Sequence, residues 1–161
     1  MNVEHLLKVQ RRSYATATTG LRSAWPESAA LDGARMTTLL ERQRYCVLAT
    51  GRADGRPHAS PVAFVVADGA FWIATVAGLR LRNLRATPWA SVVVMEGDAD
   101  EGEEGDVHLA LTAEGPVTLH EVAAVFARLE AEWLRRHTHA PEWAVAFAEL
   151  RPERIFSHGA D

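Results

Sequence analysis

Alternating apolar and polar positions in the first half of the chain predict three successive strands. Apolar runs at 45–50, 57–67 and 70–75 are rich in the β-branched and aromatic residues that strands favour. A short polar break with an Asp-Gly pair separates each run from the next. Because glycine tolerates positive φ, this pair is typical of tight hairpin turns. The pattern therefore predicts an antiparallel β-meander.

Helical periodicity and a proline predict the elements around this meander. Apolar residues recur at spacings of three and four over 120–137, the strongest helical pattern in the chain. Pro88 ends a short basic helix at 79–85, because proline lacks the N–H that a helix interior needs. The other predicted elements are helices over 3–12 and 32–44 and strands over 89–95, 107–119 and 143–157, with Pro152 at a bend or edge of the last.

The order of these elements predicts a mainly β fold with helices, in the α+β class. Strands and helices do not alternate throughout the chain, which argues against a doubly wound parallel sheet. Six mostly antiparallel strands can instead close into a small barrel. We expect an N-terminal helix and arm over 1–31, where 13–31 is rich in Ser, Thr, Ala, Gly and Pro, and a barrel domain over 32–161.

Composition and charge argue against several classes of protein. The 161 residues are 48% hydrophobic, enough for the core of one domain. Lysine and arginine number 17 against 21 acidic residues, so a dedicated nucleic-acid binder is not expected. The chain has no apolar run long enough to span a membrane, its N-terminus is too polar for a signal peptide, and Cys46 is its one cysteine. We therefore expect a cytoplasmic protein with no membrane or nucleic-acid partner.

An acidic segment separates two of the predicted strands. Residues 96–106 include seven acidic side chains and no basic one, a composition that predicts a solvated loop. A calcium loop is the functional alternative. The segment does not match the spacing of oxygen ligands, central glycine and terminal glutamate in an EF-hand, so no metal site is predicted.

The segment 75–84 is the clearest candidate for a ligand site. A strand ends at Thr75, Gly78 follows, and Arg80 and Arg82 lie where a short helix begins. Free backbone N–H groups, the positive end of the helix dipole and a guanidinium together suit a phosphate. The alternative is a surface helix whose arginines only face water.

The histidines and the cysteine also allow functional interpretations. His120, His137 and His139 are candidate metal or haem ligands, but two histidines after a helix are also typical of a polar C-terminal cap. Cys46 lies in an apolar strand pattern and is predicted to lie in the core. His58 lies in a predicted strand, where it either packs or contacts a ligand.

Two segments resemble the motifs of a known family. Residues 48–64 have the form LAT-x-x-x-DG-x-P-H-x-SPV-x-F, and residues 75–84 have the form T-x-x-G-x-R-x-R-NL. Together they resemble the FMN-binding split-barrel family related to pyridoxamine 5′-phosphate oxidase, and the ending LRPERIFSH is similar to the last strand of that family. The resemblance spans roughly 31–158 and implies a six-stranded antiparallel split β-barrel.

The resemblance also implies a cofactor and its contacts. Family members are typically homodimers that hold a flavin-type cofactor in each of two grooves between the subunits. Carried over by position, the residues that line the isoalloxazine ring are Ser60, Pro61, Val62, Ala63 and Phe64, with His58 able to face the cofactor. Those that hold the phosphate are Thr75, Arg80, Arg82 and Asn83, with Arg80 where many members have lysine.

Some positions depart from the family pattern. Gly78 and Leu79 stand where relatives carry a second basic or hydroxyl residue, which implies a thinner phosphate clamp. Trp89 follows Pro88 where arginine is common. The Arg-Leu-Ala-Pro type of C-terminal substrate motif is absent, so oxidation of vitamin B6 itself is not expected.

The resemblance leaves two classes of function open. One is an oxidoreductase that reduces or oxidises a small conjugated substrate with FMN, or with the deazaflavin coenzyme F420. The other is a non-catalytic protein that binds or carries a flavin, a deazaflavin or haem. No catalytic residue is assigned, because in flavin enzymes the cofactor itself performs the hydride or electron transfer.

Overall fold

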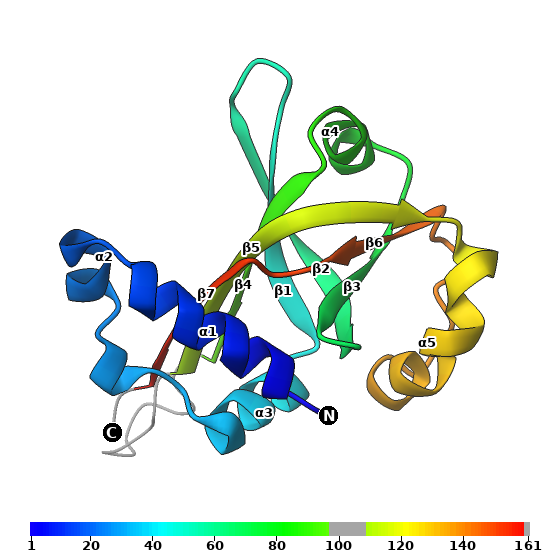
Figure 1. Ribbon diagram of the computed structural model, residues 1–161. Helices are drawn as coiled ribbons and strands as arrows, with labels where there is room; N and C mark the ends of the chain where they lie inside the picture. The colour runs from blue at the N-terminus through cyan, green and yellow to red at the C-terminus, as the bar shows by residue number, and fades with distance from the viewer. Residues whose placement is uncertain (97–108, 160–161) are drawn as a thin grey trace, which may run out of the picture.

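The computed structural model describes residues 1–96 and 109–159, and its centre is a β-barrel with helices around it (Figure 1). Within these residues the strands are β1 (Tyr45–Gly51), β2 (Pro57–Ala67), β3 (Ala70–Thr75), β4 (Trp89–Met95), β5 (Leu109–His120), β6 (Ala146–Leu150) and β7 (Arg154–Gly159). Their order is β4-β1-β2-β3-β6-β5-β7, and every pairing is antiparallel. An additional pairing of β4 with β5 closes the barrel, as the sequence predicts.

Two short strands, β6 and β7, together occupy one position of the barrel beside β5. β6 pairs with the end of β5 and β7 with its beginning, along the same edge. Pro152 lies between them and has no N–H to donate to a ladder, so the strand predicted over 143–157 is interrupted there. The connection passes so close to β5 that a Cβ at Gly115 would collide with the carbonyl oxygen of Arg151. Glycine is therefore required at this crossing.

The β-meander has the predicted bounds. The strands predicted over 57–67, 70–75 and 89–95 coincide with β2, β3 and β4. Both hairpin turns contain a glycine at positive φ, Gly55 at 82° and Gly69 at 73°. The first two residues predicted for β5 and the acidic segment beyond Glu96 lie outside the described residues.

Helices surround the barrel (Figure 1). They are α1 (Glu4–Thr16), α2 (Thr19–Ala24), α3 (Gly33–Arg42), α4 (Leu79–Ala86) and α5 (Val122–Arg136), with a 3-10 turn η1 at Glu27–Ala29. None of the helices in the described part of the chain is long and apolar enough to cross a membrane.

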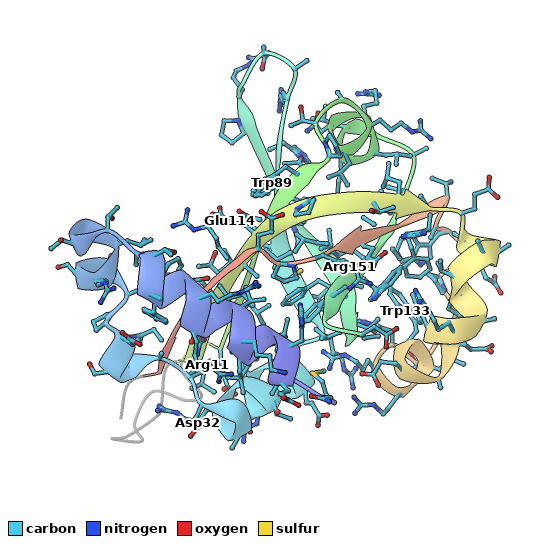
Figure 2. All side chains as sticks on the ribbon, viewed as in Figure 1. Arg11, Asp32, Trp89, Glu114, Trp133 and Arg151 are labelled. Atoms are coloured by element: carbon cyan, nitrogen blue, oxygen red, sulfur yellow. The ribbon has the colours of Figure 1, made fainter. Side chains whose placement is uncertain are left out.

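Alternation along β2 divides the apolar side chains between two clusters. Phe64 and Val66 face the barrel interior, whereas Val65 packs in a second cluster beneath α5. Trp133 of α5 belongs to that second cluster and lies between the helix and the barrel (Figure 2). Cys46 is buried in the interior, as predicted. One face of β2 thus packs in the barrel interior, and the other packs against α5.

The N-terminal helix is longer and more firmly attached than the sequence predicts. It was expected to end at residue 12, but α1 continues to Thr16 and buries Ser13 and Tyr14. Tyr14 donates to the carbonyl oxygen of Ser157 at 2.9 Å, and the Ser13 hydroxyl accepts from the N–H of Ile155 at 2.9 Å. These partners lie on β7, far away in the sequence. Residues 13–16 are therefore part of the packed structure and not of an arm.

Candidate functional site

β2 changes its partner halfway along its length. It pairs with β1 over Pro57–Ala63 and with β3 over Phe64–Ala67. The end of β3 pairs with β6 instead, through Ala74 and Thr75. The first half of β2 thus has no ladder to β3. Helix α4 follows β3 and lies at the end of the barrel from which the β1–β2 hairpin extends (Figure 1).

One side-chain contact joins the two motifs at this divergence. Arg80 Nη1 of α4 donates to the Ser60 hydroxyl of β2 at 3.2 Å. His58 and Ser60 are two residues apart on a strand and therefore lie on one face of it. Arg80 Nε and His58 Nδ1 are both buried and have no hydrogen-bond partner within residues 1–96 and 109–159. The site thus contains unused polar atoms, which a ligand would satisfy.

The charge of Arg80 is poorly solvated. Burial lowers the pKa of its guanidinium, although arginine stays protonated at neutral pH. Its electrostatic neighbour in the described part of the chain is the Cys46 thiol, and no carboxylate contributes to its pKa. Burial raises the pKa of Cys46 to about 12, so this thiol is neutral and is no nucleophile. An incoming anion would meet an uncompensated cation here.

The start of α4 offers further donors. The first helical hydrogen bond runs from the N–H of Arg82 to the carbonyl of Gly78, so the amides before Arg82 have no partner within the helix. A Cβ at Gly78 would meet open space, so protein atoms do not fill this position. Free amides at a helix start beside a guanidinium suit a phosphate. The residues present therefore fit the phosphate of a flavin nucleotide.

The other residues predicted to hold the phosphate lie apart from Arg80. The Thr75 hydroxyl is fully buried and donates to the carbonyl of Ile73 at 3.4 Å. Asn83 is also buried, and its amide donates to the Thr50 hydroxyl at 2.9 Å. Arg82 is exposed. The structure thus brings Arg80 into contact with Ser60, whereas Thr75 and Asn83 bond elsewhere, and a phosphate contact of any of the four predicted residues stays a prediction.

The residues predicted to line the flavin ring divide between the two faces of β2. Val62 and Phe64 are buried in the barrel interior. Pro61 is exposed, and Ala63 packs partly buried against the cluster beneath α5. Of these four, Pro61 and Ala63 therefore lie on the outer face, where a ring can approach the strand. Contact of any of them with a ring remains a prediction.

The candidate ligand histidines are dispersed. His120 bonds to Glu149 at 2.7 Å, whereas His137 Nε2 lies 2.9 Å from the carbonyl oxygen of Phe64. His137 also caps the end of α5, since its N–H donates to the carbonyl of Trp133. In the described residues no three His, Cys, Asp or Glu side chains are grouped to hold a metal ion.

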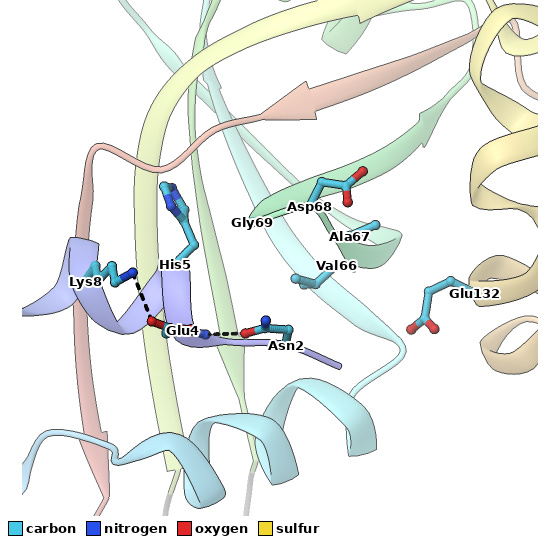
Figure 3. A pocket seen from close by; sticks show the side chains of 9 residues that line it. All are labelled: Asn2, Glu4, His5, Lys8, Val66, Ala67, Asp68, Gly69 and Glu132. Atoms are coloured by element: carbon cyan, nitrogen blue, oxygen red, sulfur yellow. Dashed lines mark hydrogen bonds and ion pairs between the residues drawn. The ribbon is translucent and has the colours of Figure 1, made fainter.

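Two hollows in the described surface lie away from the Arg80–Ser60 contact. One of about 480 Å³ lies between α1, the β2–β3 turn and α5 (Figure 3), and Lys8 and Glu4 on its rim pair with each other at 2.9 Å. The other, of about 260 Å³, has Ala63, Arg44 and Arg136 in its wall. Sequence reasoning missed both arginines, because Arg44 adjoins a strand and Arg136 ends a helix without any motif around them.

The fold is an antiparallel split barrel, with a guanidinium and free backbone amides at the start of α4. A family model described as pyridoxamine 5′-phosphate oxidase matches residues 33–159. The chain therefore belongs to the pyridoxamine 5′-phosphate oxidase family, as the motifs predict. A comparison with curated proteins finds no match.

Solved structures confirm the fold. The chain is similar to a conserved hypothetical protein of Mycobacterium tuberculosis, at 20% identity over 83% of this chain and 88% of that chain, with a TM-score of 0.69. An FAD-binding protein of Mesorhizobium loti is 18% identical over 82% and 97%, with a TM-score of 0.60. The haem storage protein of Vibrio cholerae is 21% identical over 78% and 94%, with a TM-score of 0.61.

Proposed function

We propose that the protein binds a flavin-type cofactor, FMN in the first place, and acts as an oxidoreductase on a small conjugated substrate. The observation that carries the proposal is the Arg80 guanidinium, which is held by Ser60 and which, among the described residues, has no neighbouring carboxylate and keeps a buried donor unused. A phosphate supplies both the missing charge and the missing acceptor. Membership of the family and the similar FAD-binding protein support the same proposal.

The roles of the residues follow from their places. Arg80 and the first amides of α4 hold the phosphate, and Ser60 fixes the guanidinium. Pro61 and Ala63 present a flat apolar strand surface to the ring. When bound, FMN supplies hydride or electron transfer. The protein thus binds and orients the group and excludes water from it.

A non-catalytic carrier is the second candidate. The similar haem storage protein and the open position at Gly78, where the clamp lacks a second basic residue, both favour it. Coenzyme F420 is the alternative redox cofactor, because it shares the flat ring and the phosphate of FMN. Carrier and enzyme differ in turnover and not in binding.

We place the proposed site at the interface of a homodimer. The outer faces of β1 and β4 carry exposed apolar side chains, Tyr45 at 63%, Val47 at 40% and Met95 at 59% of their full exposure. Val47 lies opposite Val93 of β4 on one side and Pro61 of β2 on the other. This continuous apolar surface of a β-sheet is suited to association.

The test is a side-by-side titration of FMN, coenzyme F420 and haem into the purified protein, followed by absorbance and fluorescence. Saturable binding of FMN or F420, with turnover of NAD(P)H or reduced F420 against electron acceptors, supports the oxidoreductase. Tight binding without turnover supports the carrier. Binding of none of the three contradicts both candidates.

A further inference from the structure

The hollow beside Ala63 has an unusual cation in its wall. Arg136, at the end of α5, is 4% exposed, and its Nη2 donates to the carbonyl oxygen of Gln43. Its guanidinium carbon lies 5.2 Å from the ring centre of Phe64. The Nε and Nη1 atoms are buried and have no hydrogen-bond partner in the part of the chain that the structure describes. A buried guanidinium with unused donors is costly, so an acceptor from outside would be bound strongly.

The surroundings of Arg136 are positive. Arg44 lines the same hollow, and none of the residues described in its wall is acidic. The nearest acidic residues that influence Arg136 are Glu132 and Glu41. Both are engaged by the neighbouring Arg135, at 2.7 and 3.6 Å. Among the described residues, the hollow therefore has no counter-charge of its own for these two arginines.

His137 does not supply that anion contact. A carbonyl oxygen only accepts, so His137 Nε2 donates its proton to Phe64 and the neutral ring keeps Nδ1 as an acceptor. Burial lowers the pKa of His137, with Arg136 and Arg44 acting in the same direction. The imidazole is therefore neutral at neutral pH, which leaves the two arginines as the cations.

Aromatic side chains form a large part of the remaining wall. Trp133 lies against His137 with ring centres 4.5 Å apart, and Tyr45 approaches the same imidazole at 6.1 Å. Trp143 also lines the hollow and is 53% exposed. A volume of about 260 Å³ lies below the range that is typical of drug-sized ligands. The space therefore suits one small flat ring that bears an acidic group.

We propose that this hollow binds small aromatic carboxylates, with Arg136 and Arg44 on the carboxylate and the exposed Trp143 against the ring. Ala63 belongs both to this hollow and to the strand predicted to line the flavin. The hollow therefore indicates aromatic carboxylates as the class of substrate for the proposed oxidoreductase. This substrate role rests on that proposed function. Binding of the anion does not rest on it, because the Arg80 position and the Arg136 hollow share no lining residue.

The test is ¹⁹F NMR of 4-fluorobenzoate with the protein free of cofactor. 4-Fluorobenzamide is the matched uncharged probe, and inorganic phosphate is the anion without a ring. We expect 4-fluorobenzoate to bind at least about tenfold more tightly than either. Equal binding of the amide overturns the role of the arginines, and equal binding of phosphate overturns the aromatic part of the proposal.

Two arginine variants provide the matched comparison. R136Q should weaken the binding of 4-fluorobenzoate by about tenfold or more, whereas R128Q should not, since Arg128 lies on the same helix but outside the hollow, where it pairs with Asp68. R44Q removes an exposed arginine and tests the same site if R136Q does not fold. Unchanged binding in a folded R136Q, or in R44Q where R136Q fails, overturns the proposal.

The outcome can be separated from that of the cofactor proposal. FMN titrated into the same samples reports the Arg80 position, and 4-fluorobenzoate reports the Arg136 hollow. Binding of FMN without 4-fluorobenzoate contradicts only the aromatic carboxylate site. Binding of 4-fluorobenzoate without FMN contradicts only the cofactor site and, with it, the assignment of the anion as a redox substrate.

Discussion

The Arg80 guanidinium and the Ser60 hydroxyl are joined by a hydrogen bond of 3.2 Å across 20 residues of sequence. Ser60 lies on β2, and Arg80 lies in the first turn of α4. The contact holds the guanidinium beside the part of β2 that pairs with β1 and not with β3. This hydrogen bond is the structural reason for placing a phosphate there.

Asn83 tests how α4 is held in place. Its buried amide bonds to the buried Thr50 hydroxyl of β1. N83A should lower the free energy of unfolding by about 1 to 3 kcal/mol, because a buried donor pair is broken. Chemical denaturation without any ligand measures this loss. R85A, which changes an exposed residue of the same helix, is the control and should be nearly neutral.

The outcome for N83A separates a positioning role from direct binding. If Asn83 only contacts the phosphate, as its motif position predicts, the variant should keep the stability of the wild type in the absence of ligand. That result would show that the bond to Thr50 does not hold the helix.

Gly115 tests the crossing of β5 by the β6–β7 connection. A methyl group in G115A would press against the backbone of Arg151, which cannot move aside without disturbing both strands. We expect a loss of several kcal/mol, on the order of 2 to 4, as for other overpacked positions. G20A in α2 is the control, since its Cβ meets open space and alanine favours a helix. Similar melting temperatures for the two variants would contradict the close approach.

The strands could be predicted from the sequence because their signals are local. β2, β3 and β4 are apolar runs bounded by Asp-Gly turns or by Pro88, and their bounds agree with the structure. The continuation of α1 through Tyr14 could not be predicted, because its stabilising partner, Ser157, lies 143 residues away. The split of the last strand falls opposite Gly115 and Pro116 of β5, between the residues that pair with β7 and those that pair with β6.

The candidate site was predictable to a similar extent. Arg80 and Ser60 lie in recognisable motifs, so their proximity was within reach of the sequence. The role of Arg136 could not be predicted from the sequence, because it depends on contacts between segments far apart in the chain. Its buried guanidinium donates to the carbonyl of Gln43 and lies over the ring of Phe64. A charged residue at the end of an amphipathic helix otherwise indicates only a solvated helix end.

Val47 tests the proposed homodimer. V47E places a carboxylate in the middle of the apolar surface on β1 and β4, where its desolvation opposes association. Sedimentation should show the wild type as a dimer and V47E as a monomer of about 17.6 kDa. L134E is the control, because Leu134 is similarly exposed at 41% but lies on α5. A monomeric wild type at micromolar concentration contradicts the dimer.

His137 tests the pH dependence of stability. Its pKa is lowered in the folded protein, mainly by burial, so the unfolded chain takes up the proton first as the pH falls. The free energy of unfolding should therefore decrease below the ordinary histidine pKa of about 6.5, by at most about 1.4 kcal/mol per pH unit, and level off below the lowered pKa. Denaturation of wild type and H137Q between roughly pH 7.5 and pH 5 measures this. An equal decrease in both proteins would contradict the assignment.

The most direct test of the cofactor site is the difference in affinity between FMN and riboflavin, which differ by the phosphate alone. Isothermal titration of both into wild type, R80A and R85A isolates the contact of Arg80. We expect FMN to bind the wild type more tightly by about 1 to 3 kcal/mol, and R80A to lose most of that difference, while R85A, which changes an exposed residue of the same helix, retains it. Equal affinities of the wild type for FMN and riboflavin, or an undiminished preference for FMN in R80A, would contradict the placement of the phosphate at Arg80.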